Sequence, residues 1–159
     1  MNTEQFGARR TSQPAMTENQ RSGHTRIDAR DAADLHEGTN VPGEFRPLTE
    51  DLEATQLAVT FVCVPPHTDF ERGTGHVHDA VEELYLISRG TLTMRCGDEI
   101  LRLTAPSAVR VDPQTPRSHR NEGDDPVEMW AVSPWIARSD STKLPGFWAP
   151  SENAERRLR

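Results

Sequence analysis

Residues 75–90 constrain the fold and chemistry of this chain more than any other stretch. His76 and His78 are separated by one residue, so on a β-strand both side chains project from the same face, because side chains alternate between the two faces. Glu83 follows five residues after His78, and a turn between them would bring its carboxylate to the two imidazoles. Two imidazoles and one carboxylate form the facial ligand set of non-haem Fe(II), and Mn, Zn or Ni can also accept it. We therefore predict a divalent metal ion (Fe, Mn, Ni or Zn) bound by these three residues.

Short apolar segments separated by Gly, Pro and Asp fill the chain between residues 55 and 136. Strands are predicted at 57–64, 84–87, 91–96, 99–103, 109–111 and 127–136, and the uninterrupted apolar run at 84–87 is predicted to be a buried strand. Gly97 and Asp98 fit a two-residue type II′ hairpin turn, in which glycine supplies a positive φ at the first central position. No periodic helical pattern lies between these segments. This is typical of an all-β barrel or jelly roll, whose closure removes exposed sheet edges.

The segment 57–64 is apolar on both of its faces. A strand of this kind is buried on both sides, so we expect one face against the barrel core and the other against an N-terminal arm or a second subunit. We therefore predict a homodimer. Cys63 and Cys96 each lie inside an apolar strand pattern, which predicts small buried thiols, with a disulfide as the alternative.

Polar sequence at both ends suggests that one domain lies in the middle of the chain. We divide the chain into a disordered tail, an N-terminal arm, a barrel, and a C-terminal tail that packs on the barrel or leaves it: residues 1–25, 26–46, 47–138 and 139–159. Within the arm, 27–37 is either a short helix ended by Gly38 or an irregular segment. Phe147 and Trp148 are expected to pin the C-terminal tail to the barrel wall or to line the barrel mouth.

Charge and hydropathy limit the classes of partner. The net charge is −7, from 18 basic and 25 acidic residues, so no nucleic-acid surface is expected. The N-terminal region lacks the apolar core of a signal peptide and any stretch that could span a membrane. We therefore expect a cytoplasmic protein whose partner is a small molecule. No Ser-His-Asp order, CxxC pair or phosphate-binding glycine motif appears.

The spacing His-x-His, four residues, Glu, six residues, Gly, which ends at Glu83 and Gly90, resembles the first motif of the cupin family. The likeness covers roughly residues 47–135. It implies a small double-stranded β-helix, or jelly-roll, barrel that often holds one metal ion. Cupin functions range from oxygenases and isomerases to metal-free sugar epimerases and storage proteins, so the resemblance implies a fold and leaves the reaction open.

The family's second motif normally offers a third histidine, and here the sequence departs from it. When the stretch is aligned on Asn121, the ligand position is occupied by Arg117, and His119 lies two residues later. In one interpretation Arg117 leaves the metal weakly bound, pairs with Glu83, or holds a ligand's carboxylate or phosphate. In the other, a bulge or register shift brings His119 to the metal, because it shares a strand face with Arg117, and the ligands are His76, His78, Glu83 and His119.

Two aromatic residues complete the predicted pocket. Tyr85 shares the face of Glu83 and is expected to line it, whereas Trp130 is either a core residue or a platform that stacks on a ligand. The predicted ligand-binding residues are thus Arg117, Tyr85 and Trp130, and no catalytic residue is assigned. Three functions remain open: a metal-dependent dioxygenase or isomerase acting on a small acidic molecule, a non-catalytic ligand-binding or sensor protein, and a structural protein.

Overall fold

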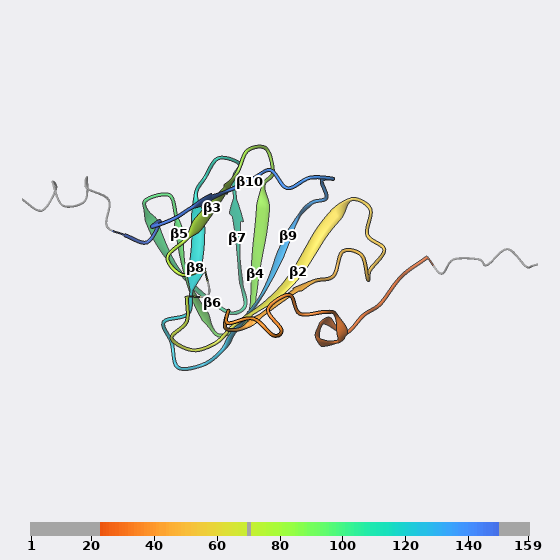
Figure 1. The fold of residues 1–159 in the computed structure, drawn as a ribbon, viewed down its shortest axis with the longest axis horizontal. Helices are drawn as coiled ribbons and strands as arrows, with labels where there is room; N and C mark the ends of the chain where they lie inside the picture. The colour runs from red at the N-terminus through yellow and green to blue at the C-terminus, as the bar shows by residue number, and fades with distance from the viewer. Residues whose placement is uncertain (1–22, 70, 150–159) are drawn as a thin grey trace, which may run out of the picture.

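The computed structural model describes residues 23–69 and 71–149, whose strands form two antiparallel sheets that make the walls of a barrel (Figure 1). The first sheet has the strand order β1-β2-β9-β4-β7, and the second has the order β10-β3-β8-β5-β6. The strands are β1 (Glu44–Pro47), β2 (Leu57–Val64), β3 (Gly75–His78), β4 (Glu83–Arg89), β5 (Thr91–Cys96), β6 (Glu99–Thr104), β7 (Ser107–Val111), β8 (Arg117–Arg120), β9 (Val127–Pro134) and β10 (Ser141–Leu144). The predicted all-β jelly-roll fold is therefore confirmed. Across the described ranges, no helix is long and apolar enough to cross a membrane.

Inward-facing apolar side chains fill the space between the two sheets. Tyr85 and Ile87 on β4 are each 2% exposed, and they pack in a buried cluster with Val62, Val64, Leu92, Met94, Val111, Val127 and Met129. Burial of one such side chain contributes about 1.5–3 kcal/mol. Leu84 and Leu86, by contrast, are 39% exposed. The prediction that β4 is buried throughout is wrong, because its second face lies on the outside of the barrel.

The hairpin between β5 and β6 has the predicted two-residue loop. Cys96 pairs with Glu99 across the two strands, which leaves Gly97 and Asp98 as the turn, and Gly97 has a φ of 58°. A side chain at this position would strain the backbone, which explains the glycine. Cys96 and Cys63 are free thiols, so the alternative of a disulfide between them is wrong.

The N-terminal arm covers the outer face of β2. Phe61 is buried there in a second cluster with Ala32 and Leu48, onto which Ile27 and Trp130 also pack. The arm is irregular and holds only a three-residue 3-10 helix, Ala29–Asp31, so the helix considered for 27–37 does not form. The two apolar faces of β2 are therefore explained within one chain, by the core on one side and the arm on the other.

A partly buried carboxylate, that of Asp34, fixes the arm close to the barrel. Asp34 Oδ1 accepts hydrogen bonds from the backbone N–H of His36 and of Phe45, both at 2.9 Å. Burial raises the pKa of Asp34, but these hydrogen bonds and the nearby Arg46 outweigh that effect and hold the pKa below its usual range. The carboxylate thereby positions His36 and Phe45, whose rings stack with centroids 5.7 Å apart.

The C-terminal segment also belongs to the barrel. Strand β10 pairs with β3 along its whole length, and Trp148 donates a hydrogen bond from Nε1 to Ser118 Oγ at 2.9 Å. Phe147 lies so close to Gly75 that a Cβ there would be 2.6 Å from its ring. Residues 139–149 therefore pack on the barrel. The predicted disordered tail falls almost wholly, and residues 150–159 fall entirely, outside the described residues.

Candidate functional site

A cavity of about 520 Å³ opens between the two sheets and has one polar and one apolar end. The polar end is formed by side chains from β3, β4 and β8 and from the loop before β3: Glu71, His76, His78, Glu83, Tyr85 and His119. The other end is mostly apolar and is formed by β1, β2, β9 and the arm: Val41, Phe45, Val62, Met129 and Ala131, with Thr60 and His36 as its polar members. A ligand in this cavity would therefore contact charged groups on one side and hydrocarbon on the other.

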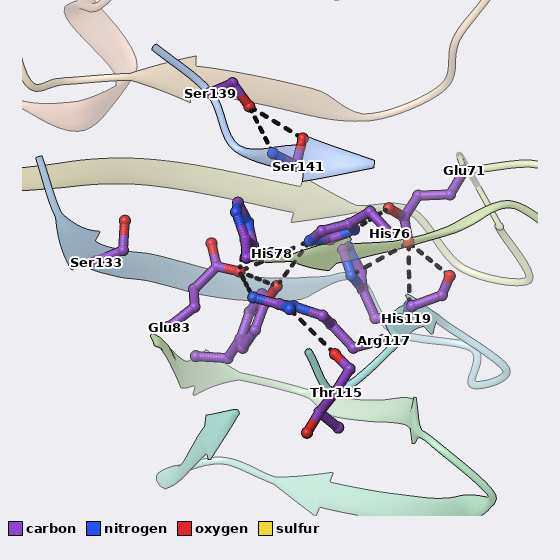
Figure 2. Close-up of polar contacts among 12 residues, drawn as sticks. Glu71, His76, His78, Glu83, Thr115, Arg117, His119, Ser133, Ser139 and Ser141 are labelled. Atoms are coloured by element: carbon purple, nitrogen blue, oxygen red, sulfur yellow. Dashed lines mark hydrogen bonds and ion pairs between the residues drawn. The ribbon is translucent and has the colours of Figure 1, made fainter. Parts of the chain in front are cut away.

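The three predicted metal ligands lie together at the polar end. One ligand atom from each of His76, His78 and Glu83 can be chosen so that all three lie within 4.8 Å of one another. The Nε2 atoms of both histidines are 3.7 Å from the same oxygen, Glu83 Oε2. Figure 2 shows the three side chains next to one another. Two imidazoles from one strand and a carboxylate from the next form a donor set that fits a divalent ion.

A second carboxylate stands behind each imidazole. Glu71 Oε1 lies 3.4 Å from His76 Nδ1, and Asp140 Oδ1 lies 2.5 Å from His78 Nδ1. Asp140 is itself held by the backbone N–H of Ala80, at 2.9 Å from Oδ2. Metal-binding histidines usually donate Nδ1–H to such a carboxylate, which fixes the ring so that Nε2 faces the ion. Sequence reasoning missed both residues, because each lies in a loop with no fixed spacing to its histidine.

The same contacts change the proton affinity of His76. Burial lowers the pKa of this imidazole, but the carboxylates of Glu71 and Glu83 beside it outweigh the effect of burial and raise the pKa to about 9. In the metal-free site at neutral pH, His76 is therefore protonated and bridges two carboxylates. A metal ion must displace this proton before it can bind Nε2.

Glu83 is the centre of the polar end. Its Oε2 accepts hydrogen bonds from Tyr85 OH at 2.5 Å and from Arg117 Nη2 at 3.1 Å. Burial raises the pKa of Glu83, but the hydrogen bonds from His76 and Tyr85 and the charge of Arg117 lower it to about 2. The carboxylate is therefore ionised, and Tyr85 keeps its proton, since burial and the charge of Glu83 raise the pKa of Tyr85 well above its ordinary value.

Arg117 is completely buried and stands behind Glu83 without lining the cavity. Its Nη1 donates to the carbonyl oxygen of Thr115 at 3.1 Å, and its Nη2 donates to Glu83 (Figure 2). Of the roles considered for Arg117 from the sequence, the structure contains the pairing with Glu83. Because Arg117 is buried behind this carboxylate, its guanidinium does not face an anion inside the cavity.

His119 lies at the cavity wall, beside Glu71. Its Nδ1 is 3.6 Å from Glu71 Oε2, and its backbone N–H donates to the same oxygen at 3.2 Å. Burial lowers the pKa of His119, although the charge of Glu71 acts in the opposite direction. Strand β8 pairs with β5 in continuous register over four residue pairs. The bulge that would bring His119 to the metal is therefore not present, and His119 stays outside the cluster of three ligands.

The two predicted aromatic ligand contacts lie in different places. Tyr85 lines the cavity, whereas Trp130 projects from the opposite face of β9 and packs edge-on against Phe61, with ring centroids 5.1 Å apart. Its neighbours Met129 and Ala131 line the cavity instead. The structure therefore does not bring Trp130 to the pocket.

Solved structures with the same fold share little sequence with this chain. A cupin protein from Bacteroides fragilis superposes with a TM-score of 0.58 at 18% identity, covering 73% of this chain and 87% of that chain. A protein with a double-stranded β-helix domain from Klebsiella pneumoniae gives 0.60 at 14% identity, covering 75% and 96%. A predicted oxalate decarboxylase from Thermotoga maritima gives 0.57 at 18% identity, covering 70% and 100%.

The family comparison agrees with the fold. No curated protein matches the chain significantly. Residues 60–133, which include the two histidines and Glu83, match the model of the cupin domain. The match ends before Asp140, so the carboxylate behind His78 lies outside the part of the chain that the family model describes. The first motif, the jelly-roll fold and the family match together show that this chain contains a cupin domain.

Proposed function

We propose that this chain is a metal-dependent cupin in which His76, His78 and Glu83 hold one divalent ion next to a small acidic molecule. The observation that carries the proposal is the arrangement of the two imidazoles. Each Nδ1 faces a carboxylate, and each Nε2 lies 3.7 Å from the same Glu83 oxygen. Two histidines that only filled a core would not need carboxylate partners on one side and a shared carboxylate on the other.

The residues around the triad of His76, His78 and Glu83 could support catalysis. A bound divalent ion would supply Lewis acidity, or a centre that activates O2, at the polar end of the cavity. Glu71 and Asp140 hold the Nδ1 protons, and Tyr85 offers a hydroxyl that stays protonated at neutral pH. The apolar end keeps water away from the body of the substrate. This arrangement supports oxygenase- or isomerase-like chemistry, and the Thermotoga neighbour's name, a predicted oxalate decarboxylase, is consistent with a small acid as substrate.

The alternative is a non-catalytic binding or sensor cupin that works without metal. The buried pair of Arg117 and Glu83, with Nη2 and Oε2 3.1 Å apart, favours it. A guanidinium at this distance neutralises the carboxylate and repels a divalent ion, so it weakens Glu83 as a ligand.

Elemental analysis of untagged protein separates these candidates. We expect one equivalent of Fe, Mn, Ni or Zn, lost in His78→Ala. The matched control is His67→Ala, which removes an exposed histidine that pairs with Asp124 away from the cluster of three ligands. Its metal content should equal that of the wild type.

Different outcomes support the other candidates. A wild-type protein that stays empty when metal is supplied, but fills after Arg117→Met, would establish the metal-free alternative. If the metal content is the same in His78→Ala and the wild type, the ion binds elsewhere and the proposed site is wrong. O2 consumption or isomerisation by the loaded protein with a panel of small acids then separates an enzyme from a sensor.

A further inference from the structure

The only lysine in the chain lies at the mouth of the cavity. Of the 18 basic residues, Lys143 alone is a lysine, and it lines the cavity from β10. We propose that Lys143 binds the charged group of the ligand, and that this ligand is a monocarboxylate with an apolar body. The inference deepens the proposed function, because it rests on a divalent ion bound at the triad.

The register of β10 directs Lys143 to the metal ligands. Lys143 pairs with His76, and Ser141 pairs with His78. Residues directly opposite each other on antiparallel strands project from the same face, with Cβ atoms about 5 Å apart. All four residues line the cavity. The flexible stem of Lys143 therefore begins next to one of the ligand histidines and can place its ammonium over the polar end.

Lys143 is available to an anion in a way that Arg117 is not. Arg117 is buried and bonded to Glu83 and to the carbonyl oxygen of Thr115. Lys143 is exposed, and none of its interactions with the described part of the chain is an ion pair. A cation at a cavity mouth that no carboxylate neutralises attracts an anionic ligand.

The charges around the cavity select an anion with a single charge. Three carboxylates, Glu71, Glu83 and Asp140, stand against two permanent cations, Arg117 and Lys143. With neutral imidazoles this sum is −1, and with His76 protonated it is zero, so the metal-free pocket carries no net positive charge that would attract an anion. A divalent ion changes the sum to +1, which one carboxylate neutralises. We therefore expect the anion to bind the metal-loaded protein and not the metal-free one.

The opposite wall of the cavity favours an apolar body for the rest of the ligand. Five of the seven residues on this side present hydrocarbon to the cavity, and Thr60 and His36 are the polar exceptions: Val62, Met129 and Ala131 from the barrel, with Val41 and Phe45 from the arm. Burying apolar surface against them stabilises a complex by about 25 cal/mol per Å². A short fatty acid or an aryl acid satisfies both ends, whereas a sugar phosphate would place hydroxyl groups against this apolar wall.

The test is calorimetric titration of Zn(II)-loaded protein with hexanoate and with its neutral analogue hexanamide. Lys143→Met should weaken hexanoate binding about tenfold, since it removes one charge-assisted contact, and should leave the weak binding of hexanamide unchanged. Lys143→Arg should restore most of the hexanoate affinity. The matched control is Arg102→Met, which removes the same charge from an exposed residue on β6, at the opposite edge of the same sheet. Its effect should be less than about twofold, because surface charges are screened over that distance.

A second measurement makes the result independent of affinity. With a single lysine, protein labelled with [15N]lysine gives one ammonium signal, and hexanoate should shift it only when metal is bound. The proposal is overturned if Lys143→Met binds hexanoate as the wild type does, if Arg102→Met has the same effect, or if the loaded wild type does not distinguish hexanoate from hexanamide. Metal content is measured in each sample, so a loaded site without anion binding refutes the role of Lys143 alone, whereas a site that does not load refutes the proposed function.

Discussion

Metal binding to this site should release one proton at slightly alkaline pH, because the pKa of His76 is raised to about 9 by the carboxylates of Glu71 and Glu83 beside it. At pH 7.5 an imidazole with that pKa is almost fully protonated, whereas an imidazole with the ordinary pKa of about 6.5 carries only about 0.1 proton. Glu83, with a pKa of about 2, is already ionised and releases none. The apparent metal affinity should therefore rise about 50-fold between pH 7 and pH 9, about tenfold over the first unit and about fivefold over the second, because the pH then reaches the pKa.

Calorimetric titration with Mn(II) at pH 7.5, repeated in buffers of different ionisation enthalpy, counts this proton directly. Glu71→Gln should lower the count, because it replaces the carboxylate 3.4 Å from His76 Nδ1 by an amide. Glu53→Gln, an exposed carboxylate outside the pocket, is the control of equal charge and should leave the count at one. A wild-type count near 0.1 would refute the argument, since His76 would then hold no proton for the metal to displace.

The same shift predicts how the metal-free protein responds to pH. The folded pKa of His76 is above its unfolded value, so its contribution to stability is complete below pH 6.5 and is lost as the pH rises toward 9. The full loss corresponds to about 3 kcal/mol. Urea unfolding in the presence of chelator should show this decline in the wild type and a smaller one in Glu71→Gln.

Three further outcomes follow from the structure. Arg117→Met should destabilise the metal-free protein by about 3–5 kcal/mol in urea unfolding, because it leaves the Glu83 carboxylate buried without its partner. Asp140→Asn should lower the metal affinity about 10–100-fold, measured by chelator competition, through loss of the carboxylate behind one histidine ligand. The homodimer stays a prediction. Leu84 and Leu86 lie exposed on the outer face of the barrel. If a second copy covers them, changing both residues to Glu should halve the mass measured by sedimentation.

The sequence predicted strands best where apolar residues form a short segment bounded by turn residues. The segment at 91–96, where apolar residues recur with the period of a strand, coincides with β5, and the segment at 57–64, which is apolar on both faces, coincides with β2. Strand β8 is not among the strands predicted from apolar patterning and enters only as the strand face shared by Arg117 and His119, although Arg117, Ser118 and His119 are buried. Its buried residues are polar and form contacts with other loops and strands, so the hydrophobic pattern that indicates a strand is missing.

The site was predictable only where its residues are close in sequence. The three metal ligands lie on two consecutive strands: His76 and His78 on β3, and Glu83 on β4. Their spacing in the sequence was therefore enough to predict that they lie close together. The contact of Asp140 with His78 spans 62 residues, and it depends on the C-terminal segment returning to pair with β3. Trp130, expected either in the core or against a ligand, lies between Met129 and Ala131, which line the cavity. Because side chains alternate along a strand, Trp130 faces the other side of β9.

The positive charge that Arg117 adds in place of the second motif's histidine is offset by a negative charge in the same pocket, that of Glu71. Arg117 in place of a neutral imidazole adds a positive charge that would disfavour a divalent ion. Glu71, which contacts His76 and His119 and accepts a hydrogen bond from Ser118 Oγ at 2.6 Å, adds a negative charge at the same end of the cavity. The two charges offset each other, so the triad can keep an overall charge suited to a metal although the third histidine is absent. On this argument Glu71→Gln weakens metal binding most when Arg117 is present, and the double variant Glu71→Gln/Arg117→Met recovers part of the affinity.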